Sequence, residues 1–299
     1  MSQTEFFAFV EGVNIDGYVH GGNCDRALSP IGVGYRLSPA DELPGEGGGK
    51  TRLKKYYEYL DGRSSLVTNF KGKTTVVVFF LDKDVDDQLG LLISTPHVIY
   101  TQFYDVENHV FDEGNVAEAV GAACSLPPNW CREEFGPQGA WQAAAAGLWI
   151  DWTRLCFLAK VLKVPGAVNY GRPSPLNTPS HEPADPMLAA KHEGDLRSSY
   201  RSATPDHDWH SARSTVETAY SIGNWDNIFK GKWYAQILSS QIQANCPNRI
   251  DIKNLAASLV KHVAATMSFA SAWSISVQKA VESLALLNGL GAAQGDSAS

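Results

Sequence analysis

Short apolar runs, separated by polar or glycine-rich segments, dominate the first third of the chain. The longest run covers residues 74–81 and is rich in β-branched and aromatic residues, which indicates a central strand buried on both faces. Shorter apolar runs at residues 6–10, 31–37 and 98–104 predict three more strands. Because helical segments lie between some of them, we expect an α/β fold in which helices flank a sheet.

Helical periodicity predicts most of the remaining elements. Residues 50–60 have a basic amphipathic pattern, whereas residues 14–28 stay ambiguous because Gly21 and Gly22 weaken a helix there. From about residue 110 onwards, helical spacing predominates. The helices predicted in this part are 116–123, 141–162, 211–221, 232–243 and 252–266.

This change in pattern predicts two domains. Residues 1–113 would form the sheet domain, and residues 114–299 a mainly helical domain that binds a partner or the substrate. Within the second domain, residues 164–208 are rich in Pro, Gly, Ser and His, which indicates a long loop or a set of short helices.

Composition narrows the class of protein. The chain has 299 residues and a formal net charge of −7, which argues against a surface that coats nucleic acid but allows one local basic patch. Five cysteines without a CxxC pair, and no export signal around residues 6–10, favour a cytoplasmic protein with reduced thiols. The apolar segment 269–290 is interrupted by Gln278, Lys279 and Glu282, so we predict a packed helix and no membrane contact.

Carboxylates follow three of the predicted strands. Asp82, Asp84 and Asp86 come after the central strand, Glu11 after the first strand, and Glu107 after the strand at 98–104. Ligands of open α/β sheets bind at the carboxyl ends of the strands, and clustered carboxylates are the ligands of hard cations. We therefore predict that these five residues bind Mg²⁺, with Mn²⁺ as an alternative, in which case Asp87 is a bystander.

The aspartates allow two other interpretations. They could form a solvated acidic exit from the strand, which needs no metal. An EF-hand is a poor match, because Asp87 stands where glycine is required and Ile93 where glutamate is required.

The order of the acidic motifs resembles the Toprim domain of topoisomerases, primases and several nucleases. The resemblance rests on Val10-Glu11-Gly12 after an early strand and Asp82-Lys83-Asp84 after a later one, and it covers about the first 113 residues. In that family the glutamate is a general acid/base and the aspartates hold Mg²⁺. The resemblance thus implies Glu11, Asp82 and Asp84 as the catalytic residues of a metal-dependent endonuclease.

Two further motifs are similar to one bacterial branch of that family. They are Tyr104-Asp105-Val106-Glu107-Asn108 and Gly231-Lys232. The branch contains nucleases of anti-phage defence, the AriB-like effectors of the PARIS system, which work beside an ABC-type ATPase. The resemblance implies a toxin effector that cleaves RNA, with tRNA among the candidates, or DNA. It also implies an ATPase partner that restrains or activates the chain, and a homodimer as the active form.

Basic residues lie beside the acidic motifs. Gly49-Lys50-Thr51 satisfies the end of a phosphate-loop pattern, but Pro44 stands where its first glycine belongs. We predict that a flexible basic segment contacts the substrate through Lys50, Arg52 and Lys54, and that Lys83, between Asp82 and Asp84, contacts it as well. The alternative for the helical lysines is an ordinary solvated helix face.

Histidines and arginines add little chemistry. His97 and His109 are predicted to be packing or surface histidines. Asp206-His207-Asp208-Trp209-His210 has a metal-like composition but no second ligand cluster, so we predict a loop. Arg197, Arg201 and Arg213 are predicted to pair with Glu193, Asp195 and Glu217 on the surface, with a local anion patch as the alternative.

Two functions from other classes stay open. A HAD-type phosphatase would use Asp82 as its phosphorylated nucleophile, because an apolar strand followed by Asp82-Lys83-Asp84 also fits that family. The position of this motif and the presence of Glu11 upstream argue against it. A non-catalytic partner subunit is the third hypothesis.

Overall fold

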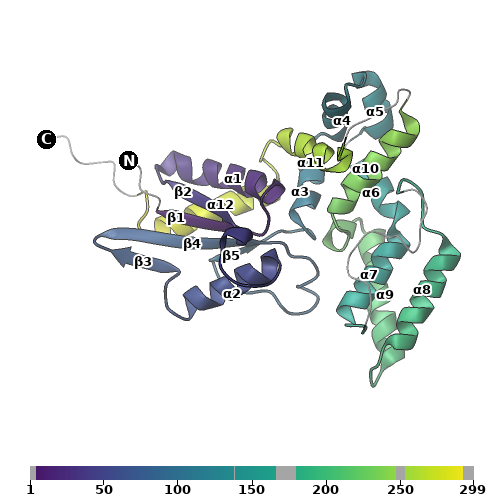
Figure 1. Cartoon of the computed structure of the whole chain (residues 1–299), viewed down its shortest axis with the longest axis horizontal. Helices are drawn as coiled ribbons and strands as arrows, with labels where there is room; N and C mark the ends of the chain where they lie inside the picture. The colour runs from purple at the N-terminus through teal and green to yellow at the C-terminus, as the bar shows by residue number, and fades with distance from the viewer. Residues whose placement is uncertain (1–4, 138, 166–179, 247–252, 292–299) are drawn as a thin grey trace. The chain divides into compact units, whose positions relative to one another are not determined.

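The computed structural model describes residues 5–137, 139–165, 180–246 and 253–291 (Figure 1). The chain divides into two compact units. The sheet unit comprises Met1–Lys83, Leu92–Gln102 and Ser268–Ser299, and the helical unit comprises Asp84–Leu91 and Phe103–Met267. The fold is thus α/β, with a parallel sheet, flanking helices and a helical part. The division differs from the predicted boundary near residue 113, because the chain leaves the sheet unit after Lys83, returns to it for Leu92–Gln102, and returns again with its last helix.

The sheet contains five strands. They are β1 (Phe6–Val10), β2 (Tyr35–Pro39), β3 (Val67–Phe70), β4 (Lys73–Leu81) and β5 (Val98–Tyr100). β1 pairs in parallel with β2 on one edge and with β4 on the other. β4 pairs in parallel with β5 through its second half, and β3 is antiparallel to the first half of β4. The parallel strands therefore have the order β2-β1-β4-β5.

Three strands differ from the sequence-based prediction. β3 was not predicted; it forms a hairpin with β4 through Lys71 and Gly72, whose φ values of 52° and 74° fit a tight two-residue turn. β2 begins later than predicted, because Ser29–Ile31 forms the 3₁₀ turn η1. β5 ends at Tyr100, where its pairing with β4 ends at Leu81.

Helices cover both faces of the sheet. They are α1 (Ile15–Leu28), α2 (Gly49–Asp61) and α12 (Ala272–Leu287), and η2 (Ala40–Glu42) precedes α2. Leu53 of α2 shares a buried cluster with Phe9, Val77 and Phe79, so α2 covers the face to which those side chains point. α1 and α12 contact each other, and α12 contacts β4; on the other face His20 of α1 stacks on Phe80, with 4.3 Å between ring centroids (Figure 1).

The ambiguous segment 14–28 is a helix despite its glycines. A Cβ atom on Gly22 would lie 2.5 Å from the ring of Phe269, so glycine is required for the close approach of that ring. The guanidinium group of Arg26 lies over the same ring, with its central carbon 4.2 Å from the centroid of Phe269. Tertiary packing at Gly22 therefore outweighs the weak helix propensity.

The helical unit is an assembly of short helices. They are α3 (Val106–Glu113), α4 (Val116–Cys124), α5 (Pro128–Phe135), α6 (Ala140–Leu148), α7 (Ile150–Val161), α8 (Pro186–Ser199), α9 (Pro205–Ser221), the 3₁₀ turn η4 (Trp225–Asn227), α10 (Lys232–Asn245) and α11 (Leu255–Ala265). Aromatic side chains form much of its core: Phe111, Trp141 and Tyr234 lie 5.3–5.9 Å apart between ring centroids. No helix of the described residues is both long and apolar enough to cross a membrane.

Two predictions for this unit were wrong. The segment 141–162 is two helices, because the chain breaks at Trp149, whose buried indole donates to the carbonyl of Ser180 over 3.1 Å. Residues 206–210 belong to the first turns of α9 and not to a loop. Pro205 at the first helical position followed by Asp206 and Asp208 is a helix-start signal, which the sequence contained.

Candidate functional site

Glu11 and Asp82 lie together at the carboxyl end of the sheet. Glu11 follows β1 and Asp82 follows β4, and the two strands are parallel neighbours with Phe9 opposite Phe79. The main-chain N–H of Asp82 donates to Oε1 of Glu11 over 2.9 Å. The structure thus brings the side chain of Glu11 against the main chain of Asp82.

The position of this pair in the strand order matters for binding. From β1 the chain passes through α1 to β2 on one side and later reaches β4 on the other side. β1 and β4 thus flank the point at which the strand order reverses, and such switch points are where open α/β sheets bind ligands. Glu11 and Asp82 are the acidic residues that directly follow these two strands.

The start of α2 packs against the same end of β1. A Cβ atom on Gly49 would lie 2.6 Å from the carbonyl oxygen of Glu11, so only glycine allows this approach. Lys50, the next residue, donates from Nζ to the carbonyl of Lys83 over 3.4 Å. The structure thus brings Lys50 to the end of β4, close to the predicted metal-binding residues of this unit.

The other predicted substrate-binding residues of the sheet unit have structural contacts. Lys83 is only 9% exposed and donates from Nζ to the carbonyl of Gln102 over 2.6 Å, which ties the end of β4 to the end of β5. Arg52 donates to the carbonyls of Ala40 and Gly47, so it braces the loop before α2. Lys54 is partly exposed on α2.

The helical unit contains the remaining predicted acidic residues. Asp84 has a left-handed backbone with a φ of 51°, and its N–H donates to the carbonyl of Tyr104 over 2.6 Å. Its Oδ2 lies 3.9 Å from Nζ of Lys160 on α7. Asp86 is buried in the following turn, where its carbonyl accepts from the N–H groups of Leu89 and Leu91. Asp87 accepts from the main-chain N–H of its neighbour Gln88.

Glu107 lies in the first turn of α3. It is 6% exposed, and its Oε1 lies 3.7 Å from Nζ of Lys232 at the start of α10. Two motifs that are far apart in the sequence therefore meet in this unit. Lys160 and Lys232 were not predicted as site residues, because their partners come from distant segments that periodicity cannot pair.

A buried polar network surrounds the start of α3. Asp105 and Asn108 form a capping box, in which each side chain accepts the main-chain N–H of the other. Asn108 also donates to Asp226 Oδ1 over 2.7 Å and to the carbonyl of Phe229 over 3.1 Å. Tyr234 donates to the same Asp226 oxygen over 2.8 Å.

Burial changes the acidity of this network. Burial raises the pKa of Asp105 to about 6, although the charge of Lys232 opposes this rise. Burial likewise raises the pKa of Asp226 to about 6, although the hydrogen bonds from Tyr234 and Asn108 oppose it. Asp226 was not predicted, since an isolated aspartate in a polar stretch has no distinguishing pattern.

The histidines have packing roles, as predicted. His109 is 2% exposed, stacks on Phe103 with 4.6 Å between centroids, and accepts the N–H of Phe103 at Nε2. His97 bonds the carbonyl of Val77 through Nδ1 over 2.7 Å. The predicted surface pairing of arginines is confirmed for Arg213, which contacts Glu193 and Glu217.

The donor chemistry of the sheet unit fits Mg²⁺. Among the described residues, no group of three or more His, Cys, Asp or Glu side chains is arranged to hold a metal ion. Mg²⁺ does not require such a cage, because it keeps several waters and commonly binds one or two carboxylates together with substrate phosphates. Glu11 and Asp82 are residues of the carboxylate type that Mg²⁺ prefers, and they follow neighbouring parallel strands at the carboxyl end of the sheet.

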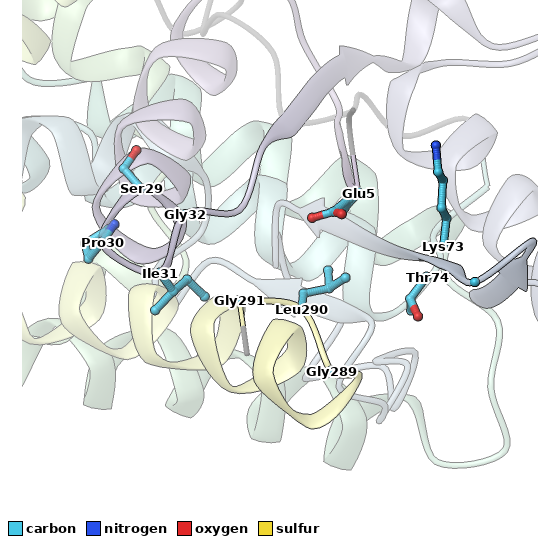
Figure 2. Close-up of a pocket in the computed structure, with 11 residues that line it drawn as sticks. Glu5, Ser29, Pro30, Ile31, Gly32, Lys73, Thr74, Gly289, Leu290 and Gly291 are labelled. Carbon is cyan, nitrogen blue, oxygen red and sulfur yellow. The ribbon is translucent and has the colours of Figure 1, made fainter. Parts of the chain in front are cut away.

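A cavity of about 750 Å³ lies at the other end of the sheet. Its lining includes Glu5, which precedes β1, Lys73 and Thr74, which begin β4, and Gly289, which follows α12 (Figure 2). These residues lie at the amino ends of the strands that Glu11 and Asp82 follow. The cavity is therefore separate from the switch point.

Comparison with known proteins leaves the geometry as the main guide. No protein-family model matches this chain, and no curated protein is significantly similar to it.

Proposed function

We propose that this chain is a metal-dependent nuclease that cleaves phosphodiester bonds. The observation that carries the proposal is the pair of acidic residues Glu11 and Asp82 at the switch point of a parallel sheet, joined by the 2.9 Å hydrogen bond between them. The order of motifs that resembles the Toprim domain supports the same proposal.

In this proposal each residue has a stated role. Glu11 and Asp82 of the sheet unit would hold Mg²⁺, whereas Asp84, Asp86 and Glu107, which the sequence also suggested as ligands, belong to the helical unit. When bound, the ion supplies charge neutralisation at the phosphate and an acidified water. Glu11 is our candidate for proton transfer, because the N–H of Asp82 fixes the orientation of its carboxylate. Lys50, held at the end of β4, is our candidate for a phosphate contact.

The biological setting is proposed on the resemblance alone. It is anti-phage defence beside an ABC-type ATPase, with RNA, including tRNA, or DNA as the substrate. A homodimer is part of the same proposal. The phosphatase alternative gains no observation from the structure, because Asp82 follows the third parallel strand along the chain and the first carries Glu11.

One set of assays separates the candidate functions. The wild-type chain is incubated with tRNA, single-stranded DNA, duplex DNA and p-nitrophenyl phosphate, each with Mg²⁺ and with EDTA. We expect cleavage of a nucleic acid that requires Mg²⁺, and strong loss of it in Asp82→Asn. This variant keeps the main-chain N–H that Glu11 accepts, so it changes the carboxylate alone.

The other outcomes have defined meanings. Hydrolysis of p-nitrophenyl phosphate without cleavage of nucleic acid would support the phosphatase. No activity of either kind, also after addition of an ABC-type ATPase encoded beside this chain, would support a non-catalytic partner. Cleavage that survives in EDTA would contradict the metal requirement.

A further inference from the structure

Gly231 is docked onto the start of α3 by hydrogen bonds. Its N–H donates to Oδ1 of Asp105 and to Oδ1 of Asn108, each over 3.1 Å. Both acceptors also belong to the capping box of α3, so one pair of side chains caps one helix and holds the start of another. The approach is closed to any side chain: a Cβ atom on Gly231 would lie 2.3 Å from the N of Asn108 and 2.4 Å from Oδ1 of Asp105.

The docking has a consequence for the next residue. Lys232 is the first residue of α10, so the position of Gly231 determines where its side chain begins. Its Nζ lies 3.7 Å from Oε1 of Glu107, whose side chain is 8% exposed, while the side chain of Lys232 is 51% exposed. The side chain of Lys232 is therefore half-exposed beside a buried carboxylate.

Stability alone is a weak reason for this arrangement. An ion pair with a half-exposed lysine contributes little to stability. The docking of Gly231, in contrast, uses buried polar side chains whose desolvation is costly unless every partner is in place. An oriented, half-exposed lysine beside a predicted metal-binding residue is the arrangement expected of a phosphate contact, since lysine binds phosphate as a compact positive charge.

We propose that Lys232 is a phosphate-binding residue of the nuclease, and that Asp105, Asn108 and Gly231 are positioning residues that hold it beside Glu107. This inference rests on the proposed nuclease function. It gives the helical unit a phosphate contact of its own. The ligand class is the phosphodiester backbone, read as charge and without base contacts.

The first experiment measures binding and cleavage of short fluorescein-labelled single-stranded RNA and DNA. Lys232→Ala should raise the KM about tenfold and change kcat less, and should reduce the slope of log K against log salt by about 0.7, the value for one lost phosphate contact on a single strand. Lys232→Arg should restore part of the affinity. Lys261→Ala, an exposed lysine of α11 in the same unit, should leave both quantities unchanged.

The positioning residues are tested with glycine variants. Gly231→Ala should raise the KM in the same direction as Lys232→Ala, because the loop must move to accept the new Cβ. Gly194→Ala in α8 is the matched control, since a Cβ there has no neighbour within 4 Å. A wild-type KM and salt slope in Lys232→Ala, in a wild-type protein that cleaves the probe, would overturn the phosphate role.

A second readout does not depend on nuclease activity. Acetylation of lysines by acetic anhydride is followed by mass spectrometry, because an ammonium held beside a carboxylate stays charged and reacts slowly. Glu107→Gln and Gly231→Ala should each accelerate acetylation of Lys232 about threefold relative to Lys261. Unchanged acetylation in both variants would overturn the positioning role. If the wild-type chain neither binds nor cleaves the probes, the proposed function and the phosphate role fail together, and acetylation alone decides the positioning role.

Discussion

Each unit has a Gly-Lys pair at the start of a helix, beside an acidic motif. In the sheet unit Gly49 approaches the main chain of Glu11, and Lys50 donates to the carbonyl of Lys83. In the helical unit Gly231 donates to the side chains of Asp105 and Asn108, and Lys232 lies beside the carboxylate of Glu107. The lysine thus meets a main-chain carbonyl in one unit and a carboxylate in the other.

The two arrangements differ in how many particular side chains they require. Packing of a helix start against a strand end follows from the βα geometry of the sheet and needs only a glycine. Docking onto Asp105 and Asn108 needs two particular side chains and the buried partners Asp226 and Tyr234. We therefore expect the helical unit to be the more sensitive of the two to changes in its polar residues.

The units should also respond differently to acid, and His20 gives the largest effect. Burial lowers the pKa of His20 from 6.5 to about 3. The unfolded chain then binds more protons than the folded one, so stability is fully present above pH 6.5 and is lost as the pH falls. Between pH 7 and pH 4 the loss should be about 3 kcal/mol.

His20→Phe should remove this pH dependence, because a phenyl ring can keep the stacking on Phe80 without a titratable group. Hydrogen exchange of peptides from α1 and β4, measured from pH 7 to pH 4 and corrected for the intrinsic rates, reads the effect in the sheet unit. His207→Gln is the control, since that side chain is 83% exposed. Equal pH dependence in wild type and His20→Phe would contradict the account.

Asp226 should give the next largest effect, with the opposite sign. Burial raises its pKa from 3.8 to about 6, so the folded chain binds more protons than the unfolded one. Its contribution to stability is present below pH 3.8 and is lost as the pH rises through 6. From pH 4 to pH 7 this loss should be about 2 kcal/mol.

Asp226→Asn keeps an oxygen that can accept from Asn108 and Tyr234 but does not titrate. Exchange of α3 and α10 peptides should therefore lose the part of its pH dependence that Asp226 causes, after the same correction, while the part due to Asp105, whose pKa burial also raises to about 6, should remain. Asp185→Asn is the control, because Asp185 caps α8 at an exposed position in the same unit. A variant of Asp226 with the pH profile of the wild type would show that this carboxylate does not control the network.

The smallest effect is expected at Gly49. Gly49→Ala must displace the start of α2 from Glu11, and we expect a destabilisation of about 1–2 kcal/mol, partly offset by the higher helix propensity of alanine. Gly48→Ala is the matched control, since a Cβ at that neighbouring position meets nothing within 4 Å. Urea unfolding of the two variants measures the difference. Equal stability would mean that the main-chain contact of Gly49 imposes no constraint.

Local patterns predicted much of the fold because its elements bury continuous apolar surface. β1 and α2 have nearly the predicted bounds, and β4 was predicted because its apolar run is long enough to exclude other elements. β3 was missed, since its four residues are mostly exposed and lack a pattern, and the turn at Lys71-Gly72 is the main signal. α1 was left open because the ring of Phe269, which explains Gly22, lies far away in the sequence.

The candidate site could be predicted only where strand order determines it. Glu11 and Asp82 follow adjacent strands, so their meeting follows from the fold class. The contacts of Asp226, Gly231 and Lys232 with the start of α3 depend on the packing of α10, for which one sequence holds no distance information. The motifs at residues 104–108 and 231–232 lie far apart in the sequence, and only the structure shows that they are in contact.

We propose that the nuclease activity depends on the carboxylate of Glu11 at the switch point. Glu11→Gln is nearly isosteric and keeps an oxygen to accept the N–H of Asp82, whereas Glu58→Gln makes the same change on the exposed face of α2. The measurement is the rate of Mg²⁺-dependent cleavage of the preferred nucleic acid by both variants, with folding verified by hydrogen exchange. The account predicts a loss of about 100-fold or more in Glu11→Gln and an unchanged rate in Glu58→Gln. A folded Glu11→Gln that cleaves at the wild-type rate would contradict it.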